Sequence, residues 1–356
     1  MKFIFIESFD IPNWNGRIAR TTKCVSVSHY AIIHLAEGLT QCGHECSVVS
    51  VTNHIVEDTY NHVEYLNYTH LNDENTECDY IIATNYINDW IALNKIIHYK
   101  KIICILYNVF TNFVLSYDFS WLNRVNTNKV CIAYTSETSK MNILQIQPAL
   151  SKYENILLYN SISSHDVYPV GEFSSTVLCV SKINQFAFFA SMSSGLQCNM
   201  DIVKYFPEFT LVTKINGDDV YKPFEPHDQM IVLEDTSKEN IITELIKSKY
   251  FIYPPCVNTT FEYVVLEALL CGVVVIAPRL PLYQELFGDA ICYIENKTET
   301  KDKGNDNDID KDTYLDKIYE LEKNPELRFQ YMEKGVKLRD KYINTTICER
   351  FLCELE

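Results

Sequence analysis

The sequence predicts two α/β domains, each built on a doubly wound parallel sheet. Three observations lead to this prediction: the length, the alternation of apolar strand-like runs with helix-like segments, and a strand–helix–strand pattern near residue 260. A chain of 356 residues, 47% of them hydrophobic, is too long for one ordinary core. It suits two domains of about 150–180 residues each.

The first half opens with a strand–helix–strand unit. Residues 2–6 form an apolar run that is typical of a buried strand, and a polar loop follows. Residues 27–42 carry apolar side chains at helical spacing, and Gly43 is suited to end that helix. Residues 45–51 form the next strand. Further strands are predicted at 79–83, 101–106 and 130–134.

The second half repeats the alternation, which favours a second parallel sheet. Strands are predicted near 186–190, 209–213, 230–233, 250–253 and 273–277, and helices near 195–205, 237–248 and 261–271. Ser, Pro and Gly cluster between residues 160 and 175, which indicates the linker. We therefore divide the chain into 1–160, 161–330 and a C-terminal helical segment, 331–356.

Composition narrows the class of protein. A net charge of −16 argues against nucleic-acid binding, because phosphate contacts need a basic surface. The 13 cysteines have no regular spacing and often lie in apolar runs, which is typical of free thiols in a core. The first residues resemble a strand rather than a signal peptide, and no apolar run is long enough for a transmembrane helix. These features predict a cytoplasmic protein.

Residues 253–278 carry the strongest functional signal. Pro254 and Pro255 close a short apolar strand that ends at Tyr253, and Gly272 ends the following helix before the apolar run 273–277. The helix is marked by apolar residues at helical spacing: Phe261, Val264, Val265, Ala268 and Leu269.

One carboxylate, Glu267, lies inside this apolar helix. A glutamate there costs stability unless it has a partner. Helix N-termini at the carboxyl edge of a parallel sheet attract anions, and a carboxylate beside them can bind ribose hydroxyls. The other interpretation is an exposed position on the helix.

The stretch Thr259-Thr260-Phe261-Glu262-Tyr263-Val264-Val265-Leu266-Glu267-Ala268-Leu269-Leu270-Cys271-Gly272 resembles the donor-binding signature of retaining GT-B glycosyltransferases of the GT4-like group. Gly43-His44-Glu45 resembles the step after the first helix in the same family. The resemblance implies a GT-B fold, two Rossmann-like domains facing a central cleft. Residues 1–160 would bind the acceptor, residues 161–330 would bind the nucleotide sugar, and the last helix would return to the N-terminal domain.

The resemblance also implies site residues. Glu267 would accept hydrogen bonds from the donor ribose. Thr259 stands where the family has an acidic residue that contacts the transferred sugar, and Glu262 is the candidate substitute through a shifted loop. Alternatively, Glu262 is a charge favoured at a helix N-terminus. Thr260, Phe261 and Val264 complete the donor segment.

A second loop, Ser191 to Gly195, resembles the family's diphosphate-binding loop. Ser193 and Ser194 occupy the place of the usual cation, so the hydroxyls of Ser191, Ser193 and Ser194, the Gly195 amide and the helix N-terminus would bind phosphate. Lys182 or Lys214 would then have to supply the positive charge. The alternative is an ordinary helix cap. Gly16 and Arg17 resemble the family's N-terminal glycine loop, although Arg17 and Arg20 also suit a plain surface.

No metal or cofactor is predicted. The histidines form no ligand pattern, Asp218-Asp219 lacks the Asp-x-Asp context, and the acidic run 298–312 lacks the glycine and glutamate of a calcium loop. The nucleotide sugar would be a co-substrate only.

The implied activity is retaining transfer of a hexose or related sugar from a nucleotide diphosphate sugar. The acceptor, whether a glycan, a lipid or a protein, stays open. A second hypothesis is a GT-B binding or scaffold protein without turnover, favoured by Thr259, by Ser193-Ser194 and by Tyr107-Asn108, where relatives carry a histidine. A third is another GT-B sugar-nucleotide enzyme such as an epimerase. A dehydrogenase is disfavoured, because no Gly-x-Gly-x-x-Gly follows the first strand.

Overall fold

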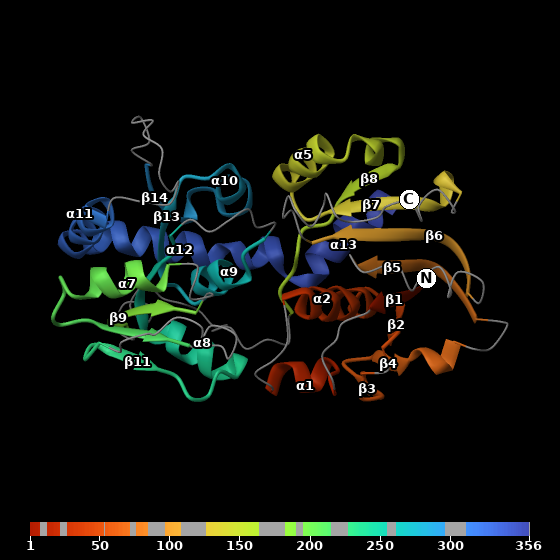
Figure 1. The fold of residues 1–356 in the computed structure, drawn as a ribbon, viewed down its shortest axis with the longest axis horizontal. Helices are drawn as coiled ribbons and strands as arrows, with labels where there is room; N and C mark the ends of the chain where they lie inside the picture. Colours follow the sequence, from red (N-terminus) through yellow and green to blue (C-terminus); the bar gives the residue numbers. More distant parts are fainter. Residues whose placement is uncertain are drawn as a thin grey trace. The chain divides into compact units, whose positions relative to one another are not determined.

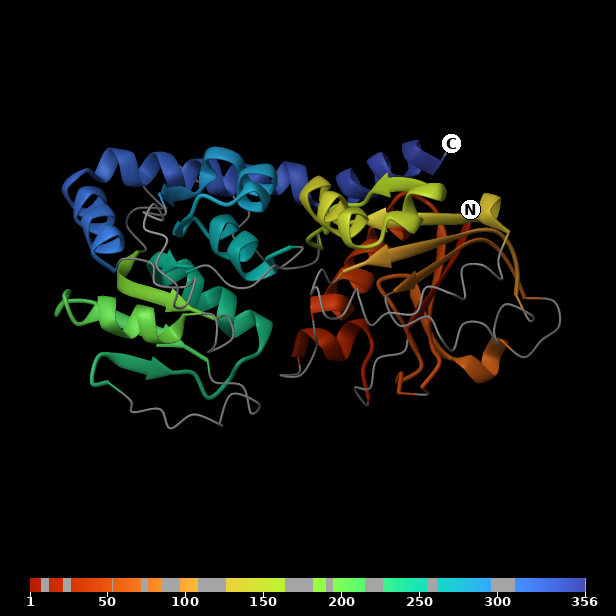
Figure 2. The ribbon, with the colours of Figure 1, turned by 45° about the horizontal axis from the view of Figure 1, so that its top comes forward.

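The protein consists of two compact units, seen here in a computed structural model. Unit 1 contains residues 1–166, 258–261 and 340–356, and unit 2 contains residues 167–257 and 262–339. The structure describes residues 1–7, 13–21, 27–52, 54–71, 76–84, 97–107, 126–163, 182–189, 195–214, 227–254, 261–295 and 311–355. Figures 1 and 2 give two views of the chain.

Unit 1 is built on an eight-stranded sheet in the order β3-β4-β2-β1-β5-β6-β7-β8. All neighbouring strands are parallel except β3 and β4, which pair antiparallel. The strands are β1 (Lys2–Glu7), β2 (Glu45–Ser50), β3 (Asp58–Tyr60), β4 (Val63–Asn67), β5 (Thr76–Thr84), β6 (Ile97–Leu106), β7 (Val130–Tyr134) and β8 (Glu154–Leu157).

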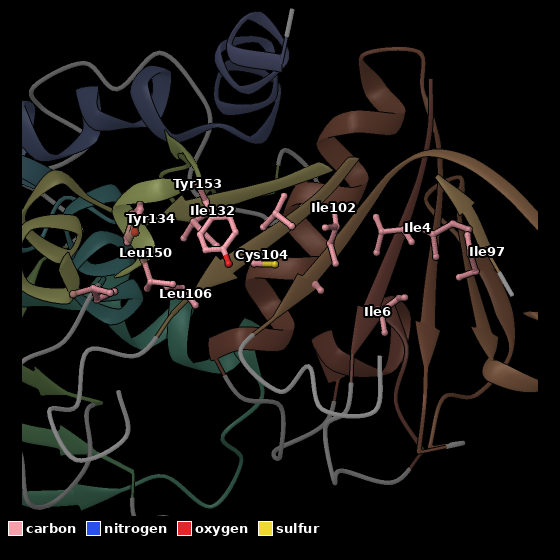
Figure 3. Close-up of a cluster of buried hydrophobic side chains, with 14 of the residues drawn as sticks. Ile4, Ile6, Ile97, Ile102, Cys104, Leu106, Ile132, Tyr134, Leu150 and Tyr153 are labelled. Carbon is pink, nitrogen blue, oxygen red and sulfur yellow. The ribbon is translucent and has the colours of Figure 1, made fainter. Parts of the chain in front are cut away.

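The described helices of unit 1 are α1 (Gly16–Thr21), α2 (Val27–Gln41), α5 (Glu137–Ile146) and α13 (Asn344–Leu355), with single 3-10 turns at Tyr68–Leu71, Thr127–Lys129 and Pro148–Lys152. Helix α13 packs against α2 (Figure 1). The alternate side chains of β1, β5, β6 and β7 form a buried aliphatic core that includes Ile4, Ile102 and Ile132 and is closed by Tyr134 and Leu150 (Figure 3). A parallel sheet is covered on both faces, so its strands need buried apolar side chains of this kind.

Unit 2 is built on a six-stranded sheet in the order β11-β10-β9-β12-β13-β14, with every neighbouring pair parallel. Its strands are β9 (Ile183–Phe188), β10 (Thr210–Thr213), β11 (Met230–Val232), β12 (Ser248–Ile252), β13 (Val274–Pro278) and β14 (Cys292–Ile294). Its helices are α7 (Leu196–Val203), α8 (Lys238–Lys247), α9 (Tyr263–Leu270), α10 (Pro281–Phe287), α11 (Lys311–Lys323) and α12 (Pro325–Tyr342), with a 3-10 turn at Gly288–Ala290. Helix α8 packs against α9, and α7 packs against α11.

The structure confirms the α/β class with two parallel sheets. Gly43 and Gly272 follow their helices with φ of +84° and +64°, in the left-handed region that glycine favours. The strands β3, β4, β8 and β14 were not predicted, because each is short or half polar. The two units divide at 166/167, within the predicted linker of residues 160–175, and residues 258–261 and 340–356 belong to unit 1.

All ten described cysteines are free thiols, and Cys104 and Cys131 are buried in the core. Among the described residues, no helix has the length and apolarity to cross a membrane.

Candidate functional site

Several described candidate site residues follow strands at the carboxyl edge of the unit 2 sheet. Because its strands are parallel, the segments that follow them start from one edge of the sheet. Gly195 follows β9, Lys214 follows β10, Lys238 follows β11 and Glu262 follows β12. This edge is the position at which open parallel sheets bind ligands.

Gly195 allows a close approach at this edge. It is the N-cap of α7 and has φ of +118°, which disfavours any residue with a side chain. A Cβ atom at Gly195 would lie 2.3 Å from Cγ of Pro254, just beyond β12. The segment before α7 and the end of β12 can therefore meet only because residue 195 is a glycine.

Asn199 ties the same two segments together. Its Nδ2 donates to the carbonyl oxygen of Gly195 at 3.0 Å and to that of Ile252 at 3.2 Å. The side chain is 1% exposed. Sequence reasoning missed it, although a polar residue three positions after the buried Leu196 is a usable signal.

Glu267 lies in α9 and has a charged partner. Its Oε1 is 3.3 Å from Nζ of Lys238, the first residue of α8; the side chains are 15% and 9% exposed. The interpretation of Glu267 as an exposed surface residue is therefore wrong, and the expectation that this glutamate needs a partner is met. Sequence reasoning missed Lys238, which sits in the unremarkable run Thr236-Ser237-Lys238.

The other described residues of the donor segment lie at the start of α9 or just before it. Glu262 is the N-cap of α9, and its side chain makes no capping hydrogen bond. Val264 is half-buried, three residues before Glu267 on the helix. The Phe261 ring is 5% exposed, belongs to unit 1 and packs edge-on against Tyr342 at 5.8 Å.

The two candidate cations lie at opposite edges of the sheet. Lys182 precedes β9, at the amino edge, and donates to the carbonyl oxygen of Cys271 at 2.8 Å. Lys182 therefore stabilises the C-terminus of α9, where lysine is favoured, and lies at the edge of the sheet opposite to Lys214. Lys214 follows β10 at the carboxyl edge and is half-buried.

Several predicted residues lie outside the described part of the chain. They are Ser191, Ser193, Ser194, Thr259, Thr260 and Asn108, together with most of the acidic run 298–312. Tyr107 is described and 7% exposed, and burial raises the pKa of its phenol above the usual range.

Gly16 and Arg17 form a separate group in unit 1. Asn15 Oδ1 accepts from the backbone N–H groups of Arg17 and Ile18 at 3.0 and 2.9 Å, which starts α1. A Cβ at Gly16 would lie 2.3 Å from the hydroxyl oxygen of Tyr65. The glycine thus permits close packing against a buried tyrosine.

Arg17 and Arg20 differ in their surroundings. Arg17 is 61% exposed and pairs with Asp58 at 3.3 Å, as expected of a surface arginine. Arg20 reaches the fully buried Glu37, and its Nη2 is 2.8 Å from Oε2 of that glutamate. The surface interpretation therefore suits Arg17 and is wrong for Arg20.

Comparison with known proteins identifies the architecture. The sequence matches no protein-family model and, at a significant level, no curated protein. The structure resembles the sucrose-phosphate synthase of Thermosynechococcus elongatus with a TM-score of 0.67 and 10% identity, covering 99% of this chain and 97% of that one. It resembles Anabaena HepE, solved with UDP, with a TM-score of 0.67 and 13% identity, covering 100% and 99%. The chain has the GT-B fold.

A further GT-B likeness is to the catalytic domain of starch synthase IV from Arabidopsis thaliana, bound to ADP and acarbose. The TM-score is 0.59 and the identity 11%, over 99% of this chain and 98% of that one. At such identities the likeness establishes the architecture. Among the described residues, no group of three or more His, Cys, Asp or Glu side chains is arranged to hold a metal ion.

Proposed function

We propose that this protein is a glycosyltransferase that transfers a sugar from a nucleoside diphosphate sugar to an acceptor hydroxyl, with retention at the anomeric carbon. The observation that carries the proposal is the mostly buried carboxylate of Glu267 in α9, a helix that follows β12 from the carboxyl edge of the unit 2 sheet, within a GT-B fold. Likeness over the whole chain to HepE with UDP-glucose and to starch synthase with ADP supports a nucleotide sugar as the donor.

The described residues suggest how the donor would be held. Glu267 would accept hydrogen bonds from the ribose hydroxyls. The backbone N–H groups that follow Gly195, at the start of α7, have no partners within the helix and would bind the diphosphate. Lys214 would supply the cation that stabilises the departing diphosphate. Ser191, Ser193, Ser194, Thr259 and Thr260 stay predicted donor contacts.

The reaction would need no metal and no protein base. Positioning brings the acceptor hydroxyl to the anomeric carbon on the face that the diphosphate leaves. The acceptor oxygen forms the new bond, the bond to the phosphate oxygen breaks, and that oxygen takes the acceptor proton. The protein then contributes orientation and charge stabilisation.

A scaffold protein that binds nucleotide without turnover is the second candidate. One observation favours it: Lys182 is engaged at the amino edge, which leaves one of the two lysines that the sequence offered as cations. If Lys214 does not reach the diphosphate, little stabilises the leaving group.

A donor-turnover assay separates the two candidates. UDP-glucose, ADP-glucose and other nucleotide sugars are incubated with the protein, and release of nucleoside diphosphate is measured with and without candidate acceptors. Release that depends on acceptor, with a product whose anomeric proton retains the donor configuration by NMR, supports the enzyme. Binding of nucleotide without release supports the scaffold.

A matched pair of variants guards this test against indirect effects. Glu267→Gln removes the proposed ribose contact. Glu244→Gln alters a glutamate of the neighbouring helix α8 that is equally exposed, at 15%, and also pairs with a lysine. Turnover should fall in the first variant and persist in the second. Equal activity in both would contradict the donor site proposed here.

A further inference from the structure

Lys238 and Glu267 stand where ordinary helix energetics would not place them. Lys238 is the first residue of α8, and a positive charge at a helix N-terminus opposes the helix dipole. Glu267 lies among apolar residues in α9, with Leu266 and Ala268 fully buried on either side. Neither helix gains from its own charge at that position, so the charges have a use beyond forming the helices.

The ion pair also carries a desolvation cost that an apolar contact between the two helices would not have. Both side chains are largely withdrawn from water, at 9% and 15% exposure, and their charged atoms are 3.3 Å apart. Replacing such a pair with apolar residues of similar volume is often neutral or stabilising. Contact between α8 and α9 could therefore be made by apolar side chains, and the retained charges indicate a need for a carboxylate in a fixed direction.

The location of the pair agrees with this need. Lys238 follows β11 and Glu267 follows β12, so both belong to helices that begin at the carboxyl edge of the parallel sheet (Figure 1). A carboxylate has two oxygens that accept several hydrogen bonds. The contact of Oε1 with the lysine restricts the rotation of the carboxylate group, and so limits the directions that Oε2 can take.

We propose that Lys238 is a positioning residue that holds the Glu267 carboxylate so that it recognises the ribose diol, and that the donor site thereby selects ribonucleotides over 2′-deoxyribonucleotides. The inference rests on the proposed function, because it needs the donor nucleotide at this edge. Lys238 acts through Glu267 and makes no contribution of its own to the diphosphate.

The test compares UDP with 2′-deoxy-UDP, and ADP with 2′-deoxy-ADP, by isothermal calorimetry. Of UDP and ADP, the one that the wild-type protein prefers should bind with an affinity at least about tenfold higher than that of its 2′-deoxy form. This is the difference expected for one hydrogen bond to a charged group. Lys238→Met should reduce this ratio to about twofold or less while affinity for the deoxynucleotide stays the same. Lys238→Arg should recover most of the ratio.

A double-mutant cycle shows whether the lysine acts through the glutamate. In the Glu267→Gln background, Lys238→Met should have no further effect on the ratio, because the group it positions is gone. Lys247→Met is the matched control on the same helix, since Lys247 pairs with Glu244 at the far end of α8. It should leave the ratio at the wild-type value.

Each remaining outcome has a defined meaning. An unchanged ratio in Lys238→Met, or equal loss of both nucleotides, overturns the inference and leaves a structural ion pair. If Lys238→Met fails to fold by circular dichroism, Lys238→Gln is measured in its place against the same expectations. Absence of binding by the wild-type protein would instead overturn the proposed function, and the inference with it.

Discussion

Two buried glutamates, one in each unit, show how the same side chain serves different ends. Glu37 in α2 accepts from Arg20 at 2.8 Å, from Asn61 at 2.9 Å and from Ser163 at 2.6 Å, and it is fully buried. Glu267 in α9 keeps 15% of its side chain exposed and pairs with Lys238 at a longer 3.3 Å. A carboxylate enclosed by short hydrogen bonds from three segments has a structural role, whereas a partly exposed carboxylate is suited to bind a ligand.

Removing Glu37 should therefore cause the largest loss of stability. Glu37→Ala leaves Arg20 without its partner in a nearly closed site, and breaking a buried pair costs about 3–5 kcal/mol of unfolding free energy. The measurement is equilibrium denaturation in urea. Glu57→Ala, at a side chain that is 42% exposed, is the control and should cost less than about 1 kcal/mol. A similar loss in both variants would contradict the structural role of Glu37.

The next largest losses of stability are expected from replacing a glycine with positive φ in each unit. Gly195→Ala should cost about 2–4 kcal/mol, because a strained φ adds to a clash with Pro254. Gly43→Ala in unit 1 has the strain alone, since nothing lies within 4 Å of its Cβ position, and should cost about 1–2 kcal/mol. Only the first should also weaken nucleotide binding. Equal losses of stability in the two variants would contradict a close approach between residue 195 and Pro254.

A buried histidine gives unit 1 a pH-dependent stability. Burial lowers the pKa of His29 to about 3 from 6.5 in the unfolded chain, so the unfolded state binds the proton more readily between these values. Stability should therefore fall as pH drops from 6.5 towards 3, by about 1.4 kcal/mol per pH unit. His29→Phe should flatten this slope in denaturation curves at pH 6.5 and 5.0. An unchanged slope would mean that other groups govern acid unfolding.

The smallest effect concerns the two lysines of unit 2. Lys182→Met removes a hydrogen bond to Cys271 and should cost about 1 kcal/mol while nucleotide affinity stays unchanged. Lys214→Met should weaken binding of a nucleoside diphosphate more than that of the nucleoside. Titration of both variants with UDP and uridine, or with the nucleotide that binds best, checks the difference. A loss of affinity in Lys182→Met alone would mean that Lys182, and not Lys214, binds the diphosphate.

The fold could be predicted from the sequence because parallel strands are continuous apolar runs and some helices end at a glycine. Gly43 and Gly272 mark two such ends. The site could be predicted only in part. Glu267 was found because a charge in an apolar helix is conspicuous, but Lys238 and Asn199 meet their partners only through the tertiary arrangement of α8 and α7.

The central claim is that Glu267 belongs to a working donor site, and calorimetric titration of nucleoside diphosphates tests it most directly. Wild-type protein and the Glu267→Gln and Glu244→Gln variants are titrated with UDP, ADP and GDP after equal folding is verified. We expect one nucleotide to bind the wild type and Glu244→Gln alike, and to bind Glu267→Gln at least about tenfold more weakly. Equal affinity in all three proteins, or no binding to any of them, would contradict the account.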